Sequence, residues 1–89
     1  MMTQIQITLN NKAGLHARPA GLLVRLLNEY KSEVTVEKNG RNVNCKSLMG
    51  LLSIGATNGD ELSITADGSD EKEAVKALNH FFSEVLLNE

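Results

Sequence analysis

Four short segments of the chain alternate between apolar and polar residues, and this pattern restricts the fold more than any other feature of the sequence. Neighbouring side chains of a β-strand point to opposite faces, so each segment predicts a strand with one apolar and one polar face. The clearest examples are residues 4–9 and 62–66, in which Ile, Leu or Ala alternates with Gln, Ser or Thr. A sheet of such strands is covered by helices on one face only.

The other two alternating segments are close together and predict a β-hairpin over residues 33–46. Valines alternate with polar residues in both strands, and Cys45 takes an inward position in the second. Asn39 and Gly40 lie between the strands. Both central positions of a type I′ turn need positive φ, which Asn and Gly adopt readily, so this dipeptide predicts the turn.

The apolar spacing becomes helical after a loop over residues 10–14. It predicts a helix from about Ala17 to near Glu29, with Pro19 in the first turn, where a missing N–H costs nothing. The residues at the helical spacing are Ala20, Leu23, Val24 and Leu27.

Two further helices are predicted. Residues 47–55 are short and apolar, with Ser47 as the candidate N-cap and Gly55 as the end. The last helix begins with Ser69 or Asp70 as its cap and extends toward the end of the chain. Its apolar stripe consists of Ala74, Leu78, Phe81, Phe82 and Val85.

The resulting order of elements is β-α-β-β-α-β-α. It predicts an α+β fold, an open-faced β-sandwich in which three helices cover one face of a four-stranded antiparallel sheet. The 89 residues suit a single domain over positions 1–89.

Composition narrows the class of protein. No segment approaches the roughly 18 consecutive apolar residues of a membrane span, and the first residues do not form a signal peptide, so a cytoplasmic protein without membrane insertion is expected. The single cysteine excludes an internal disulfide and fits a reducing compartment. A net charge of −2 argues against direct binding of nucleic acid. The first 28 residues, however, contain Lys12, Arg18 and Arg25 and no acid, which favours a phosphate or an acidic partner.

The stretch GLHARPA places His16 at the start of the first predicted helix. The unpartnered N–H groups of a first helical turn, together with the helix dipole, attract an anion. Arg18 can bind phosphate oxygens in a bidentate way, and a histidine can act as a nucleophile. An exposed capping histidine is the alternative, and local geometry alone does not decide between the two.

No other residues suggest a cofactor or a metal. His16, His80 and Cys45 lack the spacing of zinc ligands, and no glycine-rich stretch has the form of a nucleotide loop. A small acid–base enzyme using His16 would need a pocket that 89 residues can hardly enclose.

The helix predicted to start at Ser47 is too apolar for its length, because it contains Leu48, Met49, Leu51, Leu52 and Ile54. Leu22 and Leu26 likewise lie outside the core stripe of the first helix. Some of these side chains should be exposed and form a docking surface, and the alternative is a larger core. Ser47 is either a plain cap or a phosphorylation site, since a phosphate is tolerated at the positive end of a helix.

Taken together, GLHARPA (residues 14–20) and KSLMGLLSIG (residues 46–55) resemble HPr, the histidine-containing phosphocarrier family of the bacterial phosphoenolpyruvate-dependent sugar phosphotransferase system. The resemblance covers essentially the whole chain. It implies that His16 accepts a phosphoryl group on Nδ1 from enzyme I and passes it to the IIA domains of sugar permeases. Arg18 corresponds to the family's active-centre arginine. The chain would then be a phosphoryl-transfer intermediate, and not a self-standing catalyst.

The resemblance also implies regulation and docking. Ser47 matches the serine that an HPr kinase/phosphorylase modifies in carbon catabolite control, where the phosphoserine form partners a catabolite-control repressor. The family's docking patch corresponds to Leu22, Arg25, Leu48, Met49 and Leu52. A monomer without cofactor or metal is expected.

Two points qualify the resemblance. A paralogous HPr-like regulatory carrier, or an interaction protein of a non-sugar phosphorelay, is the alternative function. The paralogue that acts only in repression lacks the histidine, so His16 argues against that assignment. Ala13 stands where many Gram-positive members have a hydroxyl residue, so a local capping hydrogen bond is expected to be missing.

Overall fold

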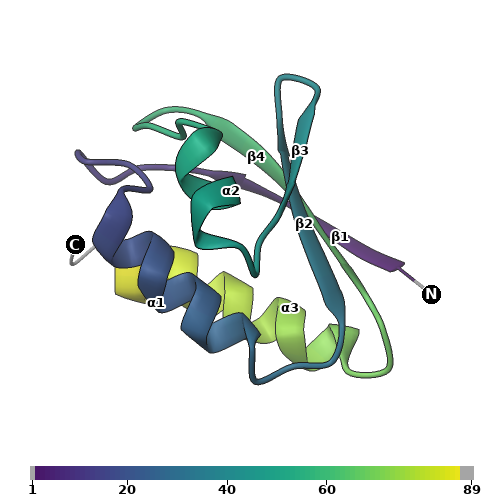
Figure 1. The fold of residues 1–89 in the computed structure, drawn as a ribbon. Coiled ribbons are helices and arrows are strands. Elements are labelled where there is room, and N and C mark those ends of the chain that lie inside the picture. The colour runs from purple at the N-terminus through teal and green to yellow at the C-terminus, as the bar shows by residue number, and fades with distance from the viewer. Residues whose placement is uncertain (1, 87–89) are drawn as a thin grey trace.

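The structure, a computed structural model, describes residues 2–86, and its centre is a four-stranded antiparallel sheet. The strands lie in the order β1-β4-β2-β3 (Figure 1). Their bounds are β1 (Met2–Thr8), β2 (Glu33–Lys38), β3 (Arg41–Asn44) and β4 (Glu61–Asp67).

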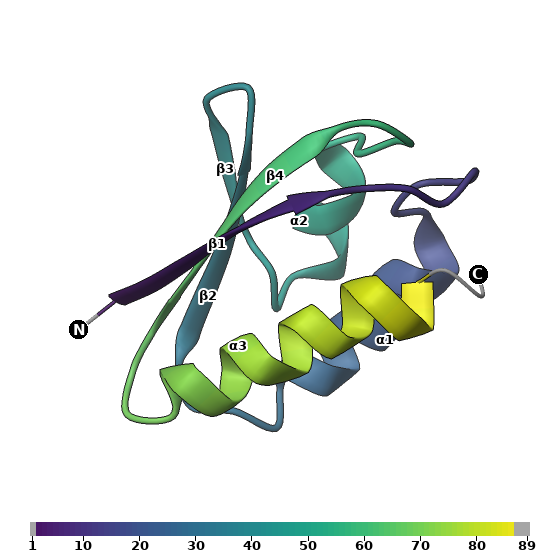
Figure 2. The same cartoon turned by 180° about the vertical axis from the view of Figure 1, so that it is seen from behind.

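The helices all lie on one side of this sheet, as the two opposite views show (Figures 1 and 2). They are α1 (Ala17–Leu27), α2 (Leu48–Ser53) and α3 (Glu71–His80), and α3 is followed by a π-helical segment, η1 (Phe81–Val85). Helix α3 contacts β1 and β4, while α2 contacts α1 and β3. The predicted α+β open-faced sandwich is therefore confirmed.

The alternating strands bury one face, as their sequence predicts. Val34 and Val36 of β2 are buried opposite Ala66 and Ile64 of β4, whereas their polar neighbours are exposed or half-buried. Full burial of a side chain of this kind contributes about 1.5–3 kcal/mol to folding. The helices supply the other half of the core, so the opposite face of the sheet is left to solvent.

The predicted hairpin is present, with its turn at the predicted place. Asn39 and Gly40 have φ of 53° and 84°, as a type I′ turn requires. Cys45 lies one residue beyond β3, is fully buried, and donates its N–H to the Val34 carbonyl at 2.8 Å. Burial raises the pKa of the Cys45 thiol to about 12, so this cysteine is a neutral core residue.

The last helix differs from the prediction of one regular helix. Beyond His80 the winding widens, and the N–H of Leu86 donates to the Phe81 carbonyl five residues earlier. Phe81 and Phe82 are both buried, with ring centroids 5.3 Å apart in an edge-to-face arrangement. A π-helical turn rotates the chain less per residue than an α-helix, which keeps both neighbouring rings on the buried side. The predicted helix over residues 87–89 lies outside the described residues.

Asp70 occupies the N-cap position of α3, as one of the two predicted candidates, but its carboxylate makes no capping bond. It accepts hydrogen bonds from the N–H of Lys31 at 2.7 Å, the N–H of Ser32 at 2.9 Å and the hydroxyl of Ser32. These bonds, that of the Ser32 hydroxyl first, hold the pKa of Asp70 below its usual value. The carboxylate thus ties the α1–β2 connection to the start of α3.

Candidate functional site

His16 is the N-cap residue of α1 and has extended backbone angles, with φ −92° and ψ −171°. Its carbonyl accepts the N–H of Ala20 at 2.9 Å, which begins the helix. The imidazole is exposed and makes no capping hydrogen bond. The ring is therefore not held by a capping bond and is accessible to a partner. An exposed capping histidine and a phosphorylation site both fit this position, so the role of His16 stays a prediction.

The first turn of α1 favours an anion beside His16. It contains no acidic residue, and Arg18 is exposed within it. Pro19 is buried and has no N–H, so it adds no backbone donor to this turn. The helix dipole adds positive potential at the same place.

The loop before His16 is fixed by close packing on the segment that follows α2. The N–H of Leu15 donates to the Ala56 carbonyl at 3.0 Å. Gly14 has φ of 69°, and a Cβ at this position would lie 2.4 Å from the Ala56 oxygen and 2.7 Å from Cα of Thr57. Only glycine both adopts this positive φ readily and leaves room for the backbone of Ala56 and Thr57. Residues distant in sequence therefore fix the position of the backbone at His16.

Asn11 supplies side-chain hydrogen bonding within this loop. Its side-chain Nδ2 donates to the Gly14 carbonyl at 2.9 Å, and its backbone carbonyl accepts the N–H of Gly14 at 3.2 Å. The missing hydroxyl at Ala13 is evident from the sequence, whereas the role of Asn11 was not predicted from it. The signal was an Asn three residues before a glycine, which is a common turn pattern.

Ser47 is the N-cap of α2, as predicted. Its Oγ accepts the N–H of Gly50 at 3.1 Å, and the residue is half-buried. A Cβ on Gly50 would lie 3.3 Å from this oxygen, so the glycine leaves the hydroxyl the space that it uses.

The predicted docking patch is exposed. Met49 has 75% of its surface accessible, and Leu22, Leu48 and Leu52 have 36–41%. Arg25 is exposed in the last turn of α1, and α1 and α2 contact each other, so the five residues belong to neighbouring helices. Leu51 of α2 and its C-cap residue Ile54 are buried, so the apolar side chains of this segment are divided between core and surface.

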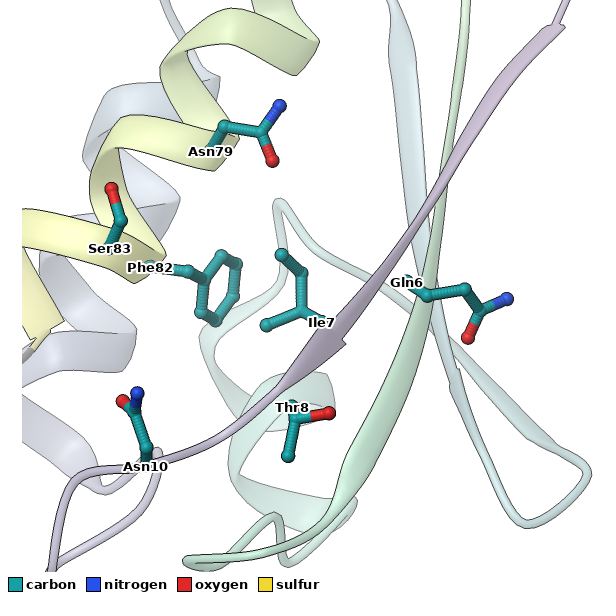
Figure 3. A pocket seen from close by; sticks show the side chains of 7 residues that line it. All are labelled: Gln6, Ile7, Thr8, Asn10, Asn79, Phe82 and Ser83. Atoms are coloured by element: carbon teal, nitrogen blue, oxygen red, sulfur yellow. The ribbon is translucent and has the colours of Figure 1, made fainter.

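A cleft of about 300 Å³ lies between β1 and the end of α3, and its lining residues are uncharged. Its lining is Gln6, Ile7, Thr8, Asn10, Asn79, Phe82 and Ser83. Ile7 and Phe82 face each other at its centre (Figure 3). His16 is not part of this lining, so the histidine is on an open surface and not in this cleft.

Within residues 2–86, no three His, Cys, Asp or Glu side chains are grouped in a way that could hold a metal ion. None of the helices formed by these residues is long and apolar enough to cross a membrane.

An open-faced sandwich with an accessible histidine at a helix N-terminus and an apolar patch on neighbouring helices is the arrangement of a small phosphocarrier domain. The family model described as the PTS HPr component phosphorylation site matches residues 3–84, and the chain belongs to this family. The resemblance noted in the sequence is thereby confirmed.

Similar proteins have both HPr and HPr-like names. The HPr-like protein Crh of Halalkalibacterium halodurans is 42% identical over 90% of this chain and 95% of its own length. The structure of HPr-C-His from Thermoanaerobacter tengcongensis has a TM-score of 0.90 and 41% identity, covering 98% of this chain and 97% of that one. An HPr dimer from the same organism has a TM-score of 0.76 and 41% identity, covering 92% and 94%. Because a dimer is among these structures, the expectation of a monomer stays a prediction.

Proposed function

We propose that this chain accepts a phosphoryl group from enzyme I on Nδ1 of His16 and passes it to the IIA domains of sugar permeases. The observation that supports this most directly is the exposed imidazole at the N-cap of α1, which no capping bond occupies. The chain belongs to a phosphocarrier family, and His16 lies within the matched residues.

The phosphoryl group is transferred twice. In the first transfer, the bond between phosphorus and Nδ1 of His16 forms as the bond between phosphorus and the donor group of enzyme I breaks. In the second, the bond between phosphorus and Nδ1 breaks as a bond between phosphorus and an acceptor group of the IIA domain forms. The first turn of α1 and Arg18 stabilise the charge on the phosphoryl oxygens. No enclosed pocket is needed, because each partner completes the site in its complex. The protein is therefore a transfer intermediate.

The docking patch would receive these partners in turn. Its exposed apolar side chains lie on the two helices that also bear His16 and Ser47. Arg25 adds positive charge at the rim, which favours an acidic partner surface and fast association. Small patches of this kind suit short-lived complexes, and we place the carrier in the cytoplasm as a monomer.

Ser47 would control this surface. A phosphate from an HPr kinase/phosphorylase would add about −1.5 to −2 units of charge directly beside Leu48 and Met49, at the start of α2. Such a charge opposes docking of a partner that prefers a basic surface, and it offers a new contact to a catabolite-control repressor.

The test is phosphorylation by phosphoenolpyruvate and enzyme I, followed by mapping of the modified residue. The wild-type chain and the matched control His80→Ala, which removes the other exposed histidine, should be phosphorylated on His16. His16→Ala should not be phosphorylated. Equal phosphorylation of His16→Ala and the wild type would overturn the assignment.

A regulatory interaction protein with an idle His16 is the second candidate. The similarity to the HPr-like protein Crh of Halalkalibacterium halodurans favours it. It predicts modification of Ser47 by ATP and the kinase, and no transfer to His16 from enzyme I.

A further inference from the structure

Lys38 and Asp60 form an ion pair at the loop that follows α2. Nζ of Lys38, at the end of β2, lies 2.8 Å from Oδ2 of Asp60 and donates to the Gly55 carbonyl at 2.9 Å. The two side chains are only 18% and 28% exposed, so solvent and salt screen the pair less than a fully exposed one. One ammonium group therefore joins the two ends of the loop over residues 55–60.

Asp60 also organises the inside of this loop. Its Oδ2 accepts the N–H of Thr57 at 2.8 Å and the hydroxyl of Thr57 at 3.1 Å. The N–H of Asp60 returns a bond to the Thr57 carbonyl at 3.0 Å. The segment is thus closed as a tight turn, and the turn depends on the carboxylate that Lys38 holds.

The loop in turn holds both ends of the segment that leads to His16. At the first end, Leu9 donates its N–H to the Asp60 carbonyl at 2.9 Å and accepts the N–H of Gly59 at 2.8 Å. At the second end, the Ala56 carbonyl accepts the N–H of Leu15 at 3.0 Å. Leu15 directly precedes His16, so two hydrogen-bonded steps connect the ion pair to the backbone of the candidate phosphorylation site.

We propose that Lys38 and Asp60 are positioning residues for His16: they fix the Ala56 carbonyl, which fixes Leu15 and hence the direction in which the imidazole leaves the N-terminus of α1. This inference rests on the proposed function of His16. The pair touches neither the phosphoryl group nor the imidazole, and it acts through the loop alone.

The effect is local. A partly exposed ion pair contributes little to global stability, but the loop that it closes can open without unfolding the core. The amide of Leu15 therefore reports on the pair, whereas amides deep in the fold, such as that of Leu78 in α3, do not.

The experiment compares Lys38→Met with Lys76→Met, a matched control that removes an exposed lysine of α3. In Lys38→Met, hydrogen exchange at the Leu15 amide should be faster by about two- to fivefold, from the usual range for such pairs. The imidazole NMR signals of His16 should shift. The kcat of enzyme I with this chain as acceptor should fall, while the KM of enzyme I for the chain stays unchanged. Lys76→Met should match the wild type, and Lys38→Arg should restore all three readouts.

Wild-type exchange at Leu15 together with unchanged His16 signals in Lys38→Met would overturn the proposal. So would a uniform rise in exchange that includes Leu78, because that pattern shows a purely structural role. Asp60→Asn provides a second variant, since it keeps an acceptor for Thr57 and loses the ion pair, and it should reproduce the local effect. If enzyme I does not phosphorylate wild-type His16 while Leu15 still responds to Lys38→Met, the proposed function fails and the positioning of the His16 backbone stands.

Discussion

Gly14 lies directly against the carbonyl of Ala56, and no side chain fits between them. This contact joins the loop before His16 to the loop after α2. Gly14→Ala combines a positive φ with a backbone clash, and a left-handed conformation alone costs an L-residue about 1–2 kcal/mol. We expect the free energy of unfolding in urea to fall by about 2 kcal/mol or more, with loss of transfer to His16.

Gly55→Ala is the control for that substitution. Gly55 has a similar φ of 65°, but a Cβ there meets nothing within 4 Å. Gly55→Ala should therefore lose stability only through the unfavourable positive φ, without a steric clash. An equal loss of stability in both variants would contradict the importance of the Gly14–Ala56 contact.

Replacement of Gly21 by alanine should change the free energy of unfolding in the opposite direction. It lies inside α1, and an added Cβ would meet no atom within 4 Å beyond its chain neighbours and the backbone of the helix itself. Gly21→Ala should raise the free energy of unfolding by about 0.5–1 kcal/mol, because alanine restricts the unfolded chain and favours the helix. Phosphorylation by enzyme I should continue. A slower transfer in the more stable variant would indicate that a partner approaches the backbone at Gly21.

Met49→Asp separates docking from folding. With 75% of its surface exposed, Met49 can change with an effect on stability of about 0.5 kcal/mol or less. The KM of enzyme I for the chain and the KM for transfer from the chain to the IIA domains should rise together. The midpoint of thermal unfolding should stay close to that of the wild type. Loss of folding instead would mean that Met49 belongs to the core.

Ser47→Asp tests the charge at the start of α2. Aspartate can accept the Gly50 N–H as the serine does, so the fold should persist, while the added charge weakens docking of enzyme I. Ser47→Asn is the matched control, because it caps without charge and should keep normal transfer. Ser47→Ala, which removes the cap, should cost about 1 kcal/mol in unfolding free energy. Unchanged kinetics of Ser47→Asp would argue against a regulatory surface here.

Asp70 should make the protein sensitive to acid. Its folded pKa is lower than the ordinary 3.8, so its contribution to stability is complete above that ordinary value and is lost as the pH falls through the lowered pKa. Asp70→Asn should therefore flatten the dependence of unfolding free energy on pH below about pH 4. Glu29→Gln, which removes an exposed carboxylate elsewhere, serves as the comparison. An acid limb that is equally steep in Asp70→Asn would exclude this source.

Local patterns in the sequence determined the element order, the hairpin turn and the place of His16. The alternation in β2 and β4, the Asn39-Gly40 turn and the Ser47 cap each depend on residues within a few positions of one another, and all are present as predicted. The exposure of some apolar side chains of α2 also followed from its length, whereas Met49 in particular was indicated by the resemblance to the family.

The tertiary structure decided the features that join distant segments. The sequence around Asp70 predicts a helix cap, but its carboxylate accepts hydrogen bonds from Lys31 and Ser32 of a distant loop. An aspartate before a helix gives the same sequence pattern in both cases. The widened turn after His80 follows from packing two phenyl rings against the core, which no helical periodicity expresses. The Gly14–Ala56 contact depends on where the loops meet in space. Sequence patterns record which face of an element is buried, whereas the partner on the other side of a contact is fixed only when the chain folds.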